Sequence, residues 1–179
     1  MCNLFLIVYC HIRWQSNYCK EFYYALAKVM DNKGQVLCID RPLAILPDII
    51  LRPRELIRSL LEKRFIKVTP NLIIYKPILF LHDQIALSRK VLTGLNRWLL
   101  RRQILKRFDI SFNDSKLFTY IIEPQQSDYM KIFDGEVSIY DCIAEWSSYP
   151  GLTEKERENR SFFENRTVKM ADVIFTVSK

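Results

Sequence analysis

Short apolar runs alternate along the chain with longer segments in which apolar residues recur every three or four positions. The short runs have the length and composition of buried β-strands, whereas the longer segments have the spacing of amphipathic helices. The strands are expected at residues 4–10, 35–40, 71–77, 117–124, 136–146 and 171–179. The helices are expected at residues 18–30, 54–63, 88–108 and 153–170.

The first strand, helix and second strand have the spacing of a βαβ unit, in which a right-handed crossover joins two parallel strands. Asn17 is expected to cap the start of this helix, and Gly34 is expected to cap its end. Repetition of such units predicts an α/β fold over residues 1–179. We expect a doubly wound, Rossmann-like domain, with a mostly parallel sheet and helices on both of its faces.

Two further local signals concern the middle and the end of the chain. Pro47 and Pro53 mark a loop, because proline interrupts regular structure. Thr153 is followed three residues later by Glu156, which predicts a capping box at the start of the last helix.

The composition excludes several classes of protein. A chain with 49% hydrophobic and 26% charged residues is expected to be globular rather than disordered. Its longest apolar run, Leu4–Cys10, is far shorter than the roughly 20 residues that span a bilayer, and it lacks the flanks of a signal peptide. The five cysteines and two histidines show no metal-binding spacing, so we expect no metal site and buried, reduced thiols. No glycine-rich phosphate loop, dinucleotide fingerprint or Gly-x-Ser-x-Gly elbow is present.

An excess of basic residues gives the chain a formal net charge of +7. Much of this excess lies between Arg89 and Arg107, where no acidic residue occurs. Such a segment attracts phosphate, nucleic acid or anionic lipid, although a solvated helix face is an equally good interpretation. The residues expected to contact a membrane or another anion are Arg97, Arg101, Arg102, Lys106 and Arg107.

Polar and aromatic side chains directly follow several of the predicted strands. Because the carboxyl ends of parallel strands meet at the ligand-binding edge of an α/β sheet, we expect these side chains to line one cleft. Carboxylates accept hydrogen bonds from hydroxyl groups and indole rings cover C–H faces, which suits a sugar or another polyol. The residues are His11, Arg13, Trp14, Asp40, Arg41, Glu123, Pro124, Asp141, Glu145 and Trp146.

Structural roles are the alternative for the same residues. The alternative for His11 is a hydrogen-bonded residue at the edge of the cleft, and this alternative is the preferred one. Trp14 and Trp146 are equally interpreted as covers of the core, and Asp141 as a cap for the backbone of the following loop.

The stretch "VSIYDCIAEWSSYPG", followed by "ENRTVKMADVIFTVSK", resembles the end of the N-terminal domain of bacterial GT-B glycosyltransferases. In that family a Tyr-Asp strand leads into an acidic-aromatic loop, a helix and an Ala-Asp segment, which Ala171 and Asp172 match here. The early "IRWQSNYCKEFYYALAKVMDNKGQVLCIDRP" and the later "TYIIEP" are similar to the opening and the cleft strand of the same domain. The chain departs from the family at Ala144, where relatives often carry an acid, and in lacking a glycine-rich first loop.

The resemblance implies the acceptor-binding half of a glycosyltransferase that moves a sugar from a nucleotide-sugar donor to a cell-surface glycan or lipid-linked acceptor. It implies that the donor-binding domain is missing from this chain, that the chain alone is inactive, and that this half binds no cofactor. His11, Asp141 and Glu145 are then the candidate catalytic bases. The residues then expected to contact the substrate are Arg13, Trp14, Glu123 and Trp146.

The family works in cell-envelope glycan synthesis, so the resemblance also implies a cytoplasmic protein that is peripheral on the inner face of the membrane. A second hypothesis from a different class is a non-catalytic α/β module that binds nucleic acid, an anionic surface or a partner chain. Nucleic acid is the less expected ligand, because no known nucleic-acid-binding motif is present.

Overall fold

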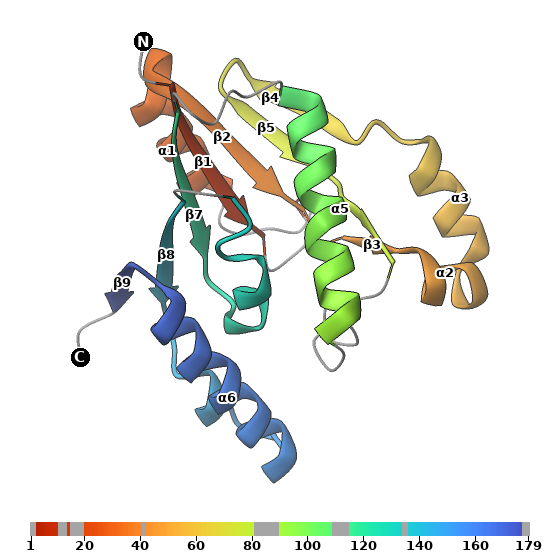
Figure 1. Cartoon of the computed structure of the whole chain (residues 1–179), viewed down its shortest axis with the longest axis vertical. Helices are drawn as coiled ribbons and strands as arrows, with labels where there is room; N and C mark the ends of the chain where they lie inside the picture. The colour runs from red at the N-terminus through yellow and green to blue at the C-terminus, as the bar shows by residue number, and fades with distance from the viewer. Residues whose placement is uncertain are drawn as a thin grey trace.

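The computed structural model describes residues 3–10, 14, 20–40, 42–80, 90–108, 115–133 and 136–176. Its centre is a seven-stranded open sheet with the strand order β4-β5-β2-β1-β7-β8-β9 (Figure 1). All neighbouring strands are parallel except β4 and β5, which form an antiparallel pair at one edge. The strands are β1 (Asn3–Tyr9), β2 (Gly34–Ile39), β4 (Phe65–Thr69), β5 (Leu72–Tyr75), β7 (Ser115–Ile121), β8 (Val137–Cys142) and β9 (Val173–Thr176).

Helices cover both faces of this sheet. Alternate residues of β1 point to opposite faces, because side chains in a strand alternate. Ile7 packs in the core cluster that contains Leu100 and Ile104 of α5, whereas Val8 packs in the cluster that contains Tyr23 of α1. The doubly wound α/β fold predicted from the sequence is therefore confirmed. The helices are α1 (Lys20–Met30), α2 (Ile45–Leu51), α3 (Pro53–Leu61), α5 (Lys90–Phe108) and α6 (Glu154–Met170).

The last helix is fixed at both ends by polar contacts. Its first turn carries the predicted capping box, in which the Glu156 backbone N–H donates to Thr153 Oγ1 at 3.3 Å and the Thr153 N–H donates to Glu156 Oε2 at 2.8 Å. Near its end, the buried Thr167 hydroxyl donates to the Pro124 carbonyl oxygen at 3.0 Å. Just beyond it, Asp172 accepts the Ser138 N–H at 2.8 Å and thereby holds the start of β9 beside β8.

The prediction of a loop around the two prolines was wrong. Pro47 lies in the first turn of α2, and Pro53 is the first residue of α3. Proline is tolerated at such positions because the N–H groups of the first turn have no partner within the helix. The short strands β3 (Leu43–Ala44) and β6 (Ile78–Leu79) pair in a separate two-stranded sheet beside these helices.

Gly34 does not cap α1 in the manner predicted. The helix ends at Met30, a short 3₁₀ turn follows, and Gly34 is extended, with φ −179° and ψ −171°. Between the end of α1 and the start of β2, the residue with a positive φ is Asp31, at 32°. Gly34 instead opens β2 directly opposite Leu4 of β1, where the two backbones approach too closely for a side chain. The predicted N-cap, Asn17, lies outside the described residues.

None of the described helices is both long and apolar enough to cross a bilayer.

Candidate functional site

The carboxyl ends of the parallel strands lie together at one edge of the sheet (Figure 1). The chain winds outward from β1 through β2 to β5, then returns to β7 on the other side of β1 and winds the opposite way through β8 to β9. Ligands of open α/β sheets bind where the strand order reverses in this way. The edge beside β1 and β7 is therefore the place for a functional site.

A small cavity of about 10 Å³ lies at this edge, next to the ends of β1 and β2. This is room for about one water molecule. Gln126, from the short helix η4 (Pro124–Tyr129), enters it, and its side-chain Nε2 donates to the Cys10 carbonyl oxygen at 3.2 Å. Its Oε1 is buried and has no hydrogen-bond partner in the described part of the chain. Gln126 thus brings an acceptor without a partner among the described residues to the lining of a cavity that has room for about one water molecule.

Asp40 also lines this cavity and is buried. Its carboxylate accepts the Trp14 backbone N–H at 2.8 Å, and its own N–H donates to the Tyr75 carbonyl oxygen at 2.8 Å. Beside it, a hydrogen bond with Cys10, followed by burial, raises the pKa of the Cys38 thiol well above its usual value. Cys10, Cys38 and Cys142 are all free thiols.

Asp141 lies at the end of β8, on the sheet face that α1 covers. The Tyr120 hydroxyl of neighbouring β7 donates to its Oδ2. Its other oxygen, Oδ1, has no hydrogen-bond partner among the described residues, and the side chain is half-buried. A carboxylate that is oriented by a tyrosine and still has a free oxygen can accept a hydrogen bond or a proton from a hydroxyl group.

Glu145 lies beside a second carboxylate, Glu164 of α6, which the sequence analysis did not identify. Burial raises the pKa of Glu164, and the negative charge of Glu145 raises it further. The Cys142 thiol lies 3.8 Å from Glu164 Oε1, and burial likewise raises the pKa of the neighbouring Tyr140 phenol. Cys142 packs against the α5-side core, so this acidic cluster belongs to the other face of the sheet from Asp141.

Trp146 follows Glu145 and packs at the border of the core cluster that contains α1. Its indole Nε1 has no hydrogen-bond partner within the described residues, although the atom itself is buried. The Trp146 carbonyl oxygen accepts from Arg160 of α6 at 3.4 Å, and its ring lies 5.7 Å from that of Tyr149. The half-buried ring leaves some apolar surface close to Glu145.

The remaining residues of the predicted cleft either make structural contacts or lie outside the described residues. Trp14 stacks on Tyr23 of α1, with ring centroids 5.8 Å apart, and Lys20 Nζ lies 5.9 Å from its ring centroid. This packing matches the alternative interpretation of Trp14 as a core cover. Glu123 is half-buried directly before η4, where its carbonyl oxygen accepts the Gln126 N–H at 2.9 Å. His11, Arg13 and Arg41 lie outside the described residues.

The basic segment forms α5, and its cations differ in their contacts. Arg97 donates to the carbonyl oxygens of Lys131 at 3.0 Å and Met130 at 3.4 Å, which is a structural role. The guanidinium of Arg102 lies over the Trp98 ring, and that of Arg107 lies over the Phe65 ring. Arg101, Arg102, Lys106 and Arg107 are exposed.

Three residues of this edge carried no signal in the sequence. In the sequence, Tyr120 is one aromatic residue within a predicted strand, and Glu164 is one of many charged residues in a polar helix. Gln126 lies two positions after Pro124 and is not part of a pattern. In the described part of the chain, no group of three His, Cys, Asp or Glu side chains is arranged to hold a metal ion.

Comparisons of the chain with models of protein families, with curated proteins and with solved structures found no match.

The raised pKa of Glu164 leads to a prediction about pH. The folded protein holds this proton more tightly than the unfolded chain, so its stability falls as the pH rises from below the ordinary glutamate value through the raised value. Glu164→Gln should therefore increase the melting temperature by about 1–2 °C at about pH 7, with no gain near pH 4. Glu158→Gln, on an exposed position of α6, is the control. An equal gain at both pH values would contradict this origin.

Proposed function

We propose that this chain is the acceptor-binding domain of a GT-B-type glycosyltransferase. The observation that carries the proposal is Asp141, whose carboxylate is oriented by Tyr120 and keeps one oxygen without a partner among the described residues. It lies at the carboxyl edge of a doubly wound sheet, where sugar hydroxyls need acceptors and an apolar surface. Trp146 supplies such a surface on the following loop. The resemblance of the sequence to that family supports the same proposal.

In the proposed reaction the acceptor hydroxyl oxygen attacks the anomeric carbon of a nucleotide-sugar. The bond from that carbon to the nucleotide phosphate breaks, and the hydroxyl proton moves to a carboxylate base. Asp141 is the residue best arranged for this transfer, and Glu145 is the second candidate. A donor-binding domain beyond this chain would supply the nucleotide-sugar, and the enzyme would act on cell-envelope glycans at the cytoplasmic face of the membrane. In a retaining enzyme the same two residues would only position the acceptor.

Acceptor binding by this chain tests the proposal. A collection of free and lipid-linked glycans is screened by saturation-transfer NMR, and the affinity of each hit is measured by calorimetry. Asp141→Asn should weaken binding about tenfold, since a hydrogen bond to a charged group is lost. Its melting temperature should stay close to that of the original protein. Glu158→Gln, an exposed change on α6, should bind normally.

Two results would contradict the proposal: an absence of glycan binding, or glycan binding that Asp141→Asn leaves unchanged.

The second candidate is a non-catalytic module for an anionic ligand, which the exposed cations of α5 favour. Binding dominated by phosphate contacts weakens steeply as salt rises, whereas sugar recognition through hydrogen bonds changes little. Titrations at low and high salt with a single-stranded oligonucleotide and with a glycan hit therefore separate the two functions. A ligand lost at high salt and insensitive to Asp141→Asn would support the second.

A further inference from the structure

Helices α2 and α3 form a projection that exposes an unusual amount of apolar surface. They lie at the opposite side of the molecule from β9 (Figure 1). Of the nineteen large apolar side chains that the described residues expose, seven come from these two short helices. They are Leu46, Ile49, Ile50, Leu51, Ile57, Leu60 and Leu61. An exposed patch of this kind usually marks a surface that binds something.

The orientation of α2 is the reverse of that of an ordinary surface helix. A helix of a water-soluble protein buries its apolar stripe and exposes its polar residues. In α2, Asp48 is buried and only 8% exposed, whereas Ile50 is 79% and Leu51 is 74% exposed. The fold therefore turns the aliphatic side chains outward.

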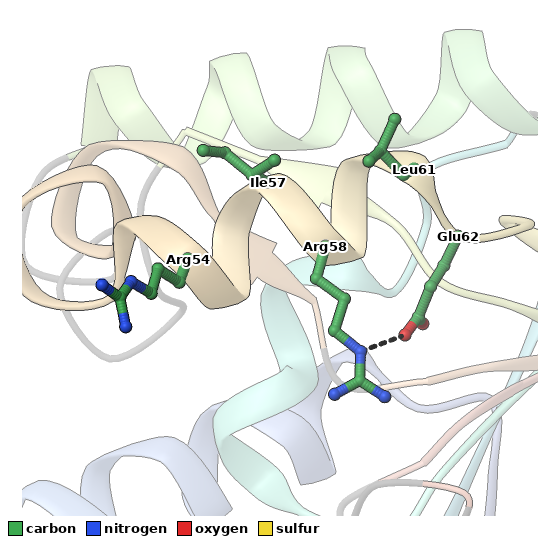
Figure 2. A pocket seen from close by; sticks show the side chains of 5 residues that line it. All are labelled: Arg54, Ile57, Arg58, Leu61 and Glu62. Carbon is green, nitrogen blue, oxygen red and sulfur yellow. Dashed lines mark ion pairs between the residues drawn. The ribbon is translucent and has the colours of Figure 1, made fainter.

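Helix α3 continues this surface. Its apolar residues occupy a single arc, since Leu56, Leu60, Ile57 and Leu61 are three or four positions apart. Only Leu56 is buried, and Leu61, at the other end of the arc, is 82% exposed. Figure 2 shows Ile57 and Leu61 on one side of α3, while Arg54 and Arg58 point away on the other. The apolar arc and the cationic side of α3 thus adjoin each other.

The charges around the patch are mostly basic. Residues 45–64 contain five basic and three acidic residues. Asp48 is buried, and Glu62 is already paired with Lys76 at 2.8 Å and with Arg58 at 3.7 Å. The exposed cations are Arg52, Arg54, Arg58, Lys63 and Arg64.

We propose that the α2–α3 surface docks on a bilayer that contains anionic lipid. Aliphatic side chains bordered by cations suit the interface of such a bilayer, where apolar groups enter the acyl boundary and guanidinium groups meet lipid phosphates. With seven and nine residues, α2 and α3 are too short to span a bilayer and would lie in its plane. A protein partner fits less well, because binding hot spots favour Trp, Tyr and Arg over Leu. The patch has arginines at its border, but all seven of its apolar side chains are Leu or Ile.

This surface is distinct from the Asp141 edge and from the α5 cations, and its proposed role does not depend on the proposed reaction. The test is flotation of the intact chain with two kinds of vesicle: phosphatidylcholine alone, and phosphatidylcholine with about one third phosphatidylglycerol. The protein should bind the anionic vesicles and bind the neutral ones about tenfold more weakly.

Two variants test which residues carry the binding. The triple variant Ile50→Ser, Leu51→Ser and Leu61→Ser should lower the vesicle partition coefficient about tenfold or more. The pair Arg54→Gln and Arg58→Gln should remove most of the preference for anionic lipid. The matched control changes Val29, Phe162 and Phe175 to serine, because these are exposed apolar residues on α1, α6 and β9. It should bind like the original chain, and circular dichroism should show the same fold for every variant.

Three outcomes would overturn the inference. The original chain could fail to float with either vesicle, or the α2–α3 triple variant could float as well as the original. The third outcome concerns the oligomeric state, which light scattering measures. If the original chain were a dimer and the triple variant a monomer, with vesicle binding unchanged, the patch would bind a second copy of the chain instead of a bilayer.

Discussion

Gly34→Ala should destabilise the protein by about 3 kcal/mol or more. This is the largest loss of stability that we expect from a single substitution. A Cβ at this position would lie 2.1 Å from the Leu4 carbonyl oxygen and 2.7 Å from Met30 Cε. The Met30 side chain can move, but the Leu4 oxygen belongs to the backbone of the central strand β1. Relief of the clash therefore requires β2 to shift away from β1, and this would disrupt the pairing at the middle of the sheet.

Urea denaturation followed by circular dichroism measures this change, and Gly94→Ala is the matched control. Gly94 is exposed in α5, and a Cβ there would meet no atom within 4 Å. Alanine is the better helix former, so this control should stabilise the chain by about 0.5–1 kcal/mol. A Gly34→Ala protein as stable as the original would show that the two strands are not so closely spaced.

Glu136→Ala should destabilise the protein by about 3 kcal/mol, because hydrogen bonds are lost and not because of a steric clash. Glu136 is buried before β8, and its carboxylate accepts the Lys131 N–H at 2.7 Å, the Phe133 N–H at 3.1 Å and the Ser138 hydroxyl at 3.3 Å. Lys131 has a φ of 57°, in the left-handed region that non-glycine residues seldom adopt, and Glu136 accepts the hydrogen bond from its N–H. Alanine leaves two backbone donors without an acceptor, at about 1–3 kcal/mol each.

Glu136→Gln is the graded control, because glutamine keeps one acceptor oxygen and the same volume, and its loss should be about half as large. Glu158→Ala, at an exposed position of α6, should change stability by less than about 0.5 kcal/mol. Urea denaturation gives the free energies, and hydrogen exchange should show faster exchange in the turn before β8. Equal stability of Glu136→Ala and Glu158→Ala would contradict the role assigned to the carboxylate.

The turn that Glu136 closes also matters for the candidate site. It leads directly into β8, which ends at Asp141. The pair of Lys131 with Asp172 joins the same turn to the start of β9, and this hydrogen bond holds the pKa of Asp172 below its usual value. Structural acids at the amino end of β8 thus fix the strand whose carboxyl end carries the proposed base.

The sequence was sufficient to predict the main strands and helices, because their signals are local. Among the described residues, apolar runs and helical spacing located every strand of the seven-stranded sheet except β4, and every α-helix except α2. The capping box of Thr153 and Glu156 was predicted correctly because its two residues are three positions apart. Strand β4 was missed because it pairs at an edge and is only partly buried. Helix α2 was missed because Pro47 within it and Pro53 just after it resemble loop signals.

Only the tertiary structure decided which side chains meet. Asp141 and Glu145 are only four positions apart in the sequence. In the fold, Asp141 accepts a hydrogen bond from Tyr120 on one face of the sheet, whereas Glu145 lies beside Glu164 of α6. Gly34 is required because β1 lies against it, and not because of its place after a helix. Helix α2 exposes Ile49 and Ile50 and buries Asp48. Such choices depend on contacts between distant segments, which periodicity and spacing along the chain do not encode.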